Sequence, residues 1–153
     1  MNFMERLIVE RFCYIEPWEN LQNGEHQSVA SLSLRLAKER GVRLRVCVVS
    51  IKNCSQFLEK CFGDSVSKKL RNRKEFLVDG VTIQLETERT LKKNLSDQPT
   101  VNLLLSPSES LLTQVESMRS SHVVLVFSET LHSEHLKGMA TEELSEVFGS
   151  QRR

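Results

Sequence analysis

Residues 42–50 read VRLRVCVVS, a stretch that alternates between apolar and charged residues and then becomes continuously apolar. Alternation over several residues is typical of a β-strand, and the run over residues 46–49 is apolar on both faces. Strands of that kind lie in the middle of parallel sheets whose two faces are both covered by helices. The stretch therefore predicts an α/β fold.

Helical and extended patterns alternate on both sides of this stretch. Apolar residues recur at helical spacing in residues 28–40, 53–62 and about 107–118, with weaker helical patterns at 64–74 and 87–95. Residues 101–105 and 122–127 are apolar runs of strand length. We expect βαβ units in a Rossmann-like, three-layer open sheet, mostly parallel, with helices on both faces. Residues 1–153 are expected to form a single α/β domain.

Capping signals predict where two of the helices begin. Asn53, followed by Gln56, has the spacing of a capping box. Ser106 is predicted to cap the helix that follows residues 101–105, with Pro107 at its first position and Glu109 at its third. Residues 19–27 are polar and contain Gly24, so they predict a loop.

Three segments keep alternatives open. Residues 6–15 lack a clean period and fit either a strand or a helix. Asp79-Gly80 between apolar runs predicts an antiparallel edge hairpin, with a single strand over residues 81–85 as the alternative. A helical tail is expected after residue 127, with Thr141 capping its last piece.

Composition excludes several classes of protein. The 153 residues are 39% hydrophobic and 27% charged, with a net charge of +1, which argues against disorder and against a general attraction to nucleic acid or membranes. The charged N-terminus lacks the apolar stretch of a secretory signal, and no apolar run is long enough to span a bilayer. Four sparse cysteines suit buried thiols in a reducing compartment. We therefore expect a soluble, cytoplasmic protein.

Hydroxyl-rich segments follow three of the predicted strands. Open parallel sheets bind ligands at the carboxyl ends of their strands, and helix N-termini favour anions. Lys52 adds a cation at the first helix start, whereas Glu109 satisfies the donors of the second. The candidate ligand-binding residues are Ser50, Lys52, Asn53, Ser55, Ser106, Ser108, Ser128 and Glu129. The alternative is that the serines are only helix caps.

Other reactive residues favour structural roles. Cys54 precedes a helix, where thiols can be activated, but it shares an apolar helix face with Phe57 and Cys61. His132 and His135 are spaced for one helix face, yet a metal requires more ligands, so no metal site and no cofactor are expected. The basic run at residues 68–74 is more typical of a solvated helix face than of a nucleic-acid site.

Residues 118–129, MRSSHVVLVFSE, resemble the later part of TIR-type signalling domains, in which a helix end, a buried strand and a Ser-rich loop follow one another. The resemblance extends over residues 111–135 and rests mostly on the general α/β pattern. The family's opening strand and the context of its catalytic glutamate have no match in this sequence. The resemblance therefore assigns no residue a role.

Two hypotheses for function follow. The first is a non-enzymatic module that binds a protein partner or a second copy of itself, with Trp18 and the basic run as contact surfaces. The alternative is binding or turnover of a small anionic ligand, such as a nucleotide, at the carboxyl ends of the strands. No set of residues forms a recognisable catalytic motif, so the sequence leaves open whether the protein is an enzyme.

Overall fold

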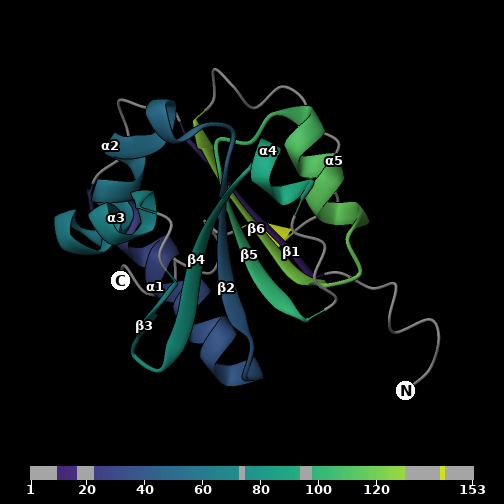
Figure 1. Cartoon of the computed structure of the whole chain (residues 1–153), viewed down its shortest axis with the longest axis horizontal. Helices are drawn as coiled ribbons and strands as arrows, with labels where there is room; N and C mark the ends of the chain where they lie inside the picture. Colours follow the sequence, from purple (N-terminus) through teal and green to yellow (C-terminus); the bar gives the residue numbers. More distant parts are fainter. Residues whose placement is uncertain (1–9, 17–22, 73–74, 94–97, 130–141, 144–153) are drawn as a thin grey trace.

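The computed structural model describes residues 10–16, 23–72, 75–93, 98–129 and 142–143, which form one sheet with helices on both faces (Figure 1). The strands are β1 (Glu10–Glu16), β2 (Arg43–Val48), β3 (Phe76–Val78), β4 (Val81–Thr87), β5 (Thr100–Leu105), β6 (Ser121–Glu129) and β7 (Glu142–Glu143). The helices are α1 (Asn23–Arg40), α2 (Ile51–Phe62), α3 (Asp64–Arg71), α4 (Glu88–Leu91) and α5 (Glu109–Ser117). None of these helices is both long and apolar enough to cross a membrane.

The sheet is parallel except at one edge. Its strand order is β3-β4-β2-β5-β6-β1-β7, and β3 and β4 form the antiparallel pair among the described strands. β2 lies between β4 and β5, so that Val46 is opposite Leu85 on one side and Leu103 on the other. The predicted open sheet, mostly parallel and with an antiparallel edge hairpin, is confirmed.

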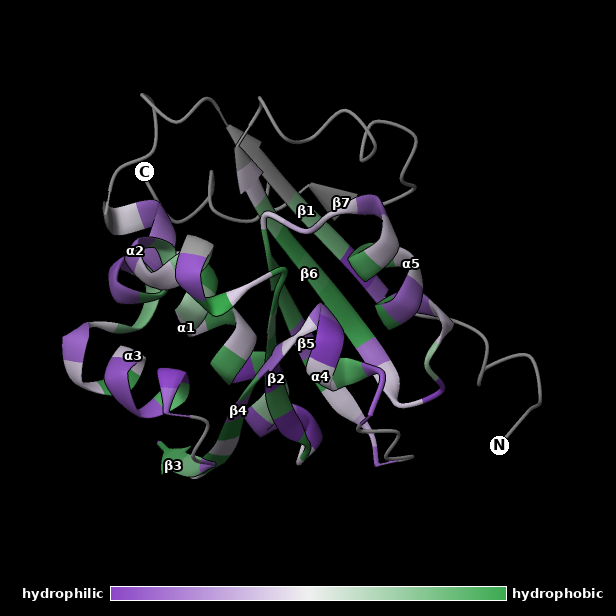
Figure 2. Cartoon of the chain, turned by 45° about the horizontal axis from the view of Figure 1, so that its top comes forward, coloured by the Kyte–Doolittle hydropathy of each residue, from purple (hydrophilic) through white to green (hydrophobic). Residues whose placement is uncertain are grey.

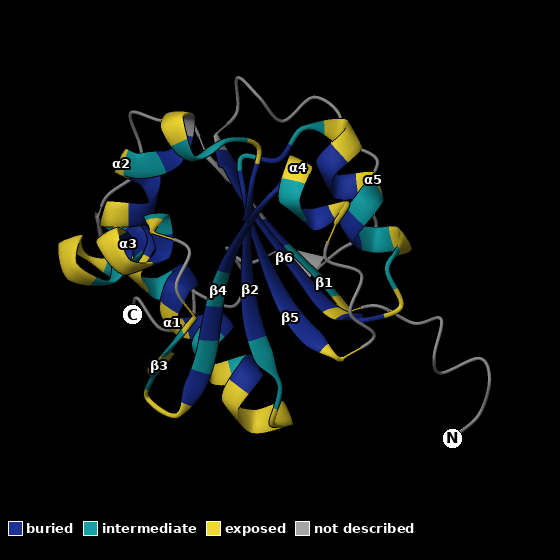
Figure 3. Cartoon of the chain, viewed as in Figure 1, coloured by how far each residue is buried: buried dark blue, intermediate teal, exposed yellow. Residues whose placement is uncertain are grey.

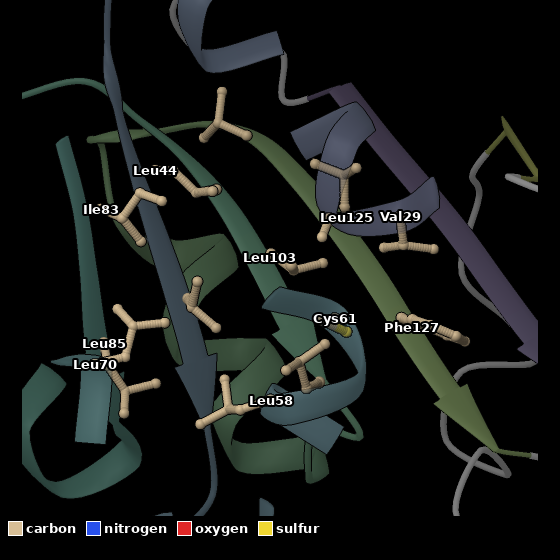
Figure 4. Packing of buried hydrophobic residues seen from close by; sticks show 14 of the residues in the cluster. Val29, Leu44, Leu58, Cys61, Leu70, Ile83, Leu85, Leu103, Leu125 and Phe127 are labelled. Carbon is tan, nitrogen blue, oxygen red and sulfur yellow. The ribbon is translucent and has the colours of Figure 1, made fainter. Parts of the chain in front are cut away.

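β2 lies inside the sheet because both of its faces are apolar. Leu44, Val46 and Val48 belong to the larger core cluster, which α1, α2 and α3 cover (Figure 4). Cys47 points to the opposite face and packs in a second cluster with Leu91 of α4 and residues of α5. In Figure 2 the strands are mostly hydrophobic, and Figure 3 shows them buried between exposed outer helix surfaces. The three-layer arrangement therefore follows from a sheet that is apolar on both sides.

α1 begins earlier than its sequence pattern indicates. The helix starts at Asn23, so the predicted loop over residues 19–27 is wrong from residue 23 onward. Glu25 lies in the first turn, where a carboxylate interacts favourably with the helix dipole. His26 is fully buried between the rings of Phe57 and Phe127. Tertiary packing thus extends the helix through a segment whose local sequence is typical of a loop.

The predicted caps of α2 and α5 are wrong. Ser50 is the N-cap of α2, and Asn53 lies within its first turn. Ser108 caps α5, whereas Ser106 lies before the helix in a left-handed conformation with φ of 47°. Both errors have one cause: each segment contains two residues able to cap a helix, and the direction in which the strand ends selects between them.

The remaining alternatives are settled by strand pairing. The described part of the first segment, from Glu10 onward, forms a strand, with Phe12 opposite Leu125 of β6. Val78 pairs with Val81 across the Asp79-Gly80 turn, which confirms the hairpin. The predicted helical tail is wrong at Glu142–Glu143, which form β7 beside β1, and its other residues lie outside the described ranges. β1 offers β7 the backbone groups on its open side, and this pairing replaces the local helical preference.

Candidate functional site

The carboxyl ends of β2 and β5 lie side by side, and the chain leaves them in opposite directions. Cys47 is opposite Leu104 where the pairing of these strands ends. After β2 the chain enters α2, on the face of the sheet that also carries α1 and α3. After β5 it enters α5, on the opposite face, which also carries α4 (Figure 1). Diverging connections of this kind mark the switch point of an open α/β sheet, the place where such sheets bind ligands. The loops after β2 and β5 therefore form the candidate site, which we call the switch-point crevice.

The N-terminus of α2 forms one wall of the switch-point crevice. Ser50, its N-cap residue, is extended and makes no side-chain capping hydrogen bond. The Ser50 Oγ atom is buried and has no hydrogen-bond partner among the described residues. The first turn contains no acidic side chain, and the exposed Lys52 adds a cation to it. Helix amides without a side-chain cap, together with the helix dipole, make this wall attractive to an anion.

The N-terminus of α5 forms the second wall and is satisfied by its own side chains. The Ser108 hydroxyl accepts a hydrogen bond of 3.1 Å from the amide of Leu111. Glu109 lies in the first turn of α5, and the Ser110 hydroxyl donates to Glu88 of α4. The two walls therefore differ in charge: the first turn of α5 carries Glu109, whereas the first turn of α2 contains no acidic side chain.

Ser106 connects the loop that leads to the second wall to the rest of the sheet. Its amide donates a hydrogen bond of 2.8 Å to the carbonyl of Phe127, which holds the loop after β5 against the end of β6. Its left-handed backbone costs a residue other than glycine about 1–2 kcal/mol. Strain of this kind persists where surrounding contacts enforce it, and functional sites are one such place.

The other predicted site residues have different surroundings. Ser128 is fully buried in β6, opposite Ile15 of β1. Ser55 is half-buried on α2, beyond the residues of its first turn. The backbone of Asn53 lies in α2, and the backbone of Glu129 lies at the end of β6. Their side chains are not among the described ones. The predicted residues at the two neighbouring strand ends and helix starts are Ser50, Lys52, Ser106 and Ser108.

Val49 was missed by the sequence reasoning. Its side chain is 40% exposed, although it ends an apolar run that predicts burial throughout. It stands directly between β2 and the N-cap Ser50, in the loop that leaves the carboxyl end of β2. Ligand sites combine apolar contacts with a few polar groups, and Val49 supplies an apolar surface here. Periodicity does not distinguish this residue from the buried residues before it.

The cysteines have the properties of core residues. All four are buried free thiols. Burial raises the pKa of Cys54 to about 11, against the lowering effects of its backbone hydrogen bond and of Arg71. Burial also raises the pKa of Cys47 to about 12. A protonated thiol is a poor nucleophile, so these properties support the core assignment of Cys54.

Local contacts balance much of the basic run on α3. Lys68 pairs with Asp64 at 3.5 Å, and Arg71 pairs with Glu59 of α2 at 3.6 Å. No cluster of three or more His, Cys, Asp or Glu side chains able to hold a metal occurs in the described part of the chain. Several candidates lie outside that part: Trp18, Arg73, Lys74, His132 and His135.

Two hollows on the surface are less suited to an anion. One, of about 430 Å³, adjoins the end of α1 and contains Lys38 and Arg43. Each of these cations has its own carboxylate partner, at 3.4 and 2.9 Å, and the carbonyl end of α1 disfavours anions. The other, of about 570 Å³, lies between α4 and α5 and is lined by Glu88 and Glu109. The switch-point crevice remains the candidate site for an anionic ligand.

No family model, no curated protein and no solved structure matches this chain. The fold and the crevice define an open α/β sheet protein with a topological switch point. Such folds support many activities, so the function depends on the residues of the site.

Proposed function

We propose that this protein binds a small ligand through a phosphate or carboxylate group at the N-terminus of α2. The proposal rests on one observation, the uncapped start of a helix at the switch point, where the buried Ser50 hydroxyl has no partner among the described residues. A buried hydroxyl without a hydrogen-bond partner destabilises the folded chain, and a hydrogen bond to a ligand oxygen would remove that cost. An anion at this position would also accept hydrogen bonds from the first amides of α2.

The charges around the switch-point crevice favour a ligand with one anionic group. Lys52 and the positive end of α2 attract the anion, while Glu109 on the second wall repels negative charge. The favourable field is therefore confined to one side of the crevice. A phosphate suits this side because its oxygens can accept from the helix amides, from Ser50 and from Lys52 together.

Val49 favours a ligand with an apolar or aromatic part next to that anionic group. Its exposed side chain precedes Ser50 in the chain and offers a contact for a flat ring or a short hydrocarbon. A nucleoside monophosphate combines both features. It is the class of ligand that we expect to bind, with the phosphate at α2 and the base toward Val49.

Thermal unfolding in the presence of ligands tests this proposal. A ligand that binds the folded chain at 100 times its Kd adds about 2.7 kcal/mol to the free energy of unfolding. We expect nucleoside monophosphates to raise the melting temperature more than inorganic phosphate does. Ser50→Ala and Lys52→Gln should reduce the shift. Lys68→Gln removes the same charge from α3 and serves as the matched control.

The outcomes of this experiment separate a specific site from general electrostatic attraction. Equal losses for Lys52→Gln and Lys68→Gln would show that only net charge matters and would reject the site. Absence of a shift for phosphate and for all nucleotides at millimolar concentration would reject the proposed function. A shift that both crevice variants lose, while Lys68→Gln retains it, supports binding at α2.

A further inference from the structure

The hairpin edge of the sheet exposes an apolar side chain. Leu77 in the middle of β3 is 69% exposed, more than Val49, the other large hydrophobic residue described as exposed. β3 is the terminal strand of the sheet and has a neighbour on one side, β4. Edge strands can pair with other chains, and proteins commonly block them with charged side chains. This edge carries a leucine at its centre instead.

The turn determines which backbone groups of β3 face outward. Asp79 and Gly80 form a two-residue loop with φ of 52° and 81°, the signs required by a type I′ turn. The residues that flank such a loop, Val78 and Val81, form a hydrogen-bonded pair, and such pairs alternate along an antiparallel ladder. The next pair, Leu77 with Thr82, is therefore of the non-hydrogen-bonded kind. It follows that the amide and carbonyl of Leu77 point away from β4, toward the free edge.

The two faces of this edge differ in chemistry. Phe76 and Val78 point toward α3 and pack against the larger core cluster, so Leu77 points to the opposite face. The ammonium of Lys69 lies 5.5 Å from the centre of the Phe76 ring, and no carboxylate among the described residues pairs with it. α3 carries three cations and one carboxylate. The face beside Phe76 is thus positive, whereas Leu77 is an exposed apolar side chain flanked two residues away by Glu75 and Asp79, which pair with Arg43 and Lys38.

We infer that β3 binds an extended segment of a partner protein as an additional strand. The segment places an apolar residue opposite Leu77 and an acidic residue opposite Phe76, beside Lys69. Side chains alternate between the faces of a strand, so a segment that alternates apolar and acidic residues matches both faces at once. Backbone hydrogen bonds from Leu77 supply register, and the side chains supply specificity.

Electrostatics disfavour a second copy of this chain as the occupant. Antiparallel self-pairing centred on Leu77 sets Glu75 directly opposite Asp79 of the other copy, and does so twice because of the two-fold symmetry. Like charges directly opposite each other destabilise a strand pair. A three-residue strand also contributes little of the area that a stable dimer buries. A short segment of a different protein avoids the repulsion, because its residues opposite Glu75 and Asp79 need not be acidic, and a peptide contact does not require the area of a stable dimer.

Fluorescence anisotropy with a labelled peptide of alternating valine and glutamate tests the inference. We expect this peptide to bind, and we expect the affinity of the alternating valine and lysine peptide to be lower by about tenfold or more. That ratio corresponds to a charge contact at a partly desolvated edge. Methylation of the backbone nitrogen of the peptide residue opposite Leu77 should abolish binding. The Leu77 amide should shift in a nitrogen-15 NMR spectrum.

Variants of exposed residues complete the test without unfolding the chain. Leu77→Lys should abolish binding, because it blocks the edge with a charge. Lys69→Glu should reverse the preference between the two peptides, while Lys68→Glu, with the same change in net charge, should have a smaller effect. Equal binding of both peptides, or binding insensitive to Leu77→Lys, would overturn the inference. Sedimentation that shows self-association of the chain, lost in Leu77→Lys, would also overturn it. The absence of peptide binding at millimolar concentration would do the same.

Discussion

The ring of Phe57 on α2 meets the ring of Phe127 on β6 edge to face, with centroids 5.0 Å apart and planes at 83°. His26 of α1 lies 5.1 Å from each of these two rings, so the three side chains form one cluster between two helices and the sheet. The carbonyl of Phe127 also accepts the amide of Ser106. The same residue therefore supports α2 through its side chain and the loop after β5 through its backbone, which are the two sides of the switch-point crevice.

Removal of the Phe127 ring should cause a large loss of stability. The side chain is fully buried, and Phe127→Ala leaves a cavity that α1 and α2 cannot easily close. We expect the free energy of unfolding to fall by about 3–5 kcal/mol in urea titrations. Leu77→Ala, at an exposed position, is the control and should change it by about 0.5 kcal/mol or less. A loss below about 1 kcal/mol for Phe127→Ala would show that the cluster contributes little.

Replacement of Arg45 by methionine should stabilise the protein. Arg45 is 2% exposed, and among the described residues its Nε has no hydrogen-bond partner and no carboxylate forms an ion pair with it. Its Nη1 group reaches the sulfur of Met118 at 3.6 Å. An apolar replacement removes the cost of desolvating this charge, so we expect Arg45→Met to add about 1–4 kcal/mol in urea titrations.

Arg43→Met is the matched control for this change. Arg43 precedes Arg45 on the same face of β2, is more exposed and pairs with Glu75 at 2.9 Å. Exposed ion pairs contribute about 0–1 kcal/mol, so this variant should be nearly neutral. A destabilised Arg45→Met variant would mean that the cation has a role in the folded state beyond its contact with Met118.

Stability should decrease in alkaline solution in a manner that depends on Cys47. Burial raises the pKa of Cys47 to about 12 from an ordinary 9.0, so between these values the folded chain retains a proton that the unfolded chain has lost. The contribution of the protonated Cys47 thiol to the free energy of unfolding is complete below pH 9 and is lost as the pH rises toward 12. Unfolding titrations at several pH values should show a shallower alkaline decrease in Cys47→Ala than in the unmodified chain. Identical slopes would contradict the prediction.

Two glycines should respond in opposite directions to the same substitution. Gly80 has φ of 81°, so Gly80→Ala is strained although the space around it is open, and we expect a loss of about 1 kcal/mol or more. Gly24 lies in α1, also has open space around it and is not in the left-handed region. Gly24→Ala should add about 0.5–1 kcal/mol. Thermal unfolding of both variants measures the difference, and effects of equal sign would show that the turn is not selective for glycine.

Some elements were predictable because their signals are local. Residues 42–50 predicted a central strand, since a run that is apolar on both faces requires cover on both sides. Asp79-Gly80 predicted the hairpin, because a two-residue turn places both residues at positive φ. The difference in charge between the starts of α2 and α5 was also predictable from the sequence, since Lys52 and Glu109 lie in the first turns themselves.

Other features depend on contacts between distant segments. The helical start at Asn23 requires the aromatic rings that bury His26, and the choice of Ser50 and Ser108 as caps requires the strand ends that precede them. The exposure of Val49 and Leu77 follows from their places at the end of one strand and at the edge of the sheet. Local propensity carries no information on these contacts.

The sequence by itself determined an alternating α/β chain, the edge hairpin and a group of hydroxyl and cationic residues at strand ends. The tertiary structure decided that β2 and β5 are neighbours with diverging connections, and it thereby selected two of those strand ends as one crevice. The physical reason is that periodicity reports which residues are buried, whereas strand order depends on which buried faces pack together. Ser50 and Ser106 are separated along the chain, and the neighbouring strands that carry them place them at one edge of the sheet.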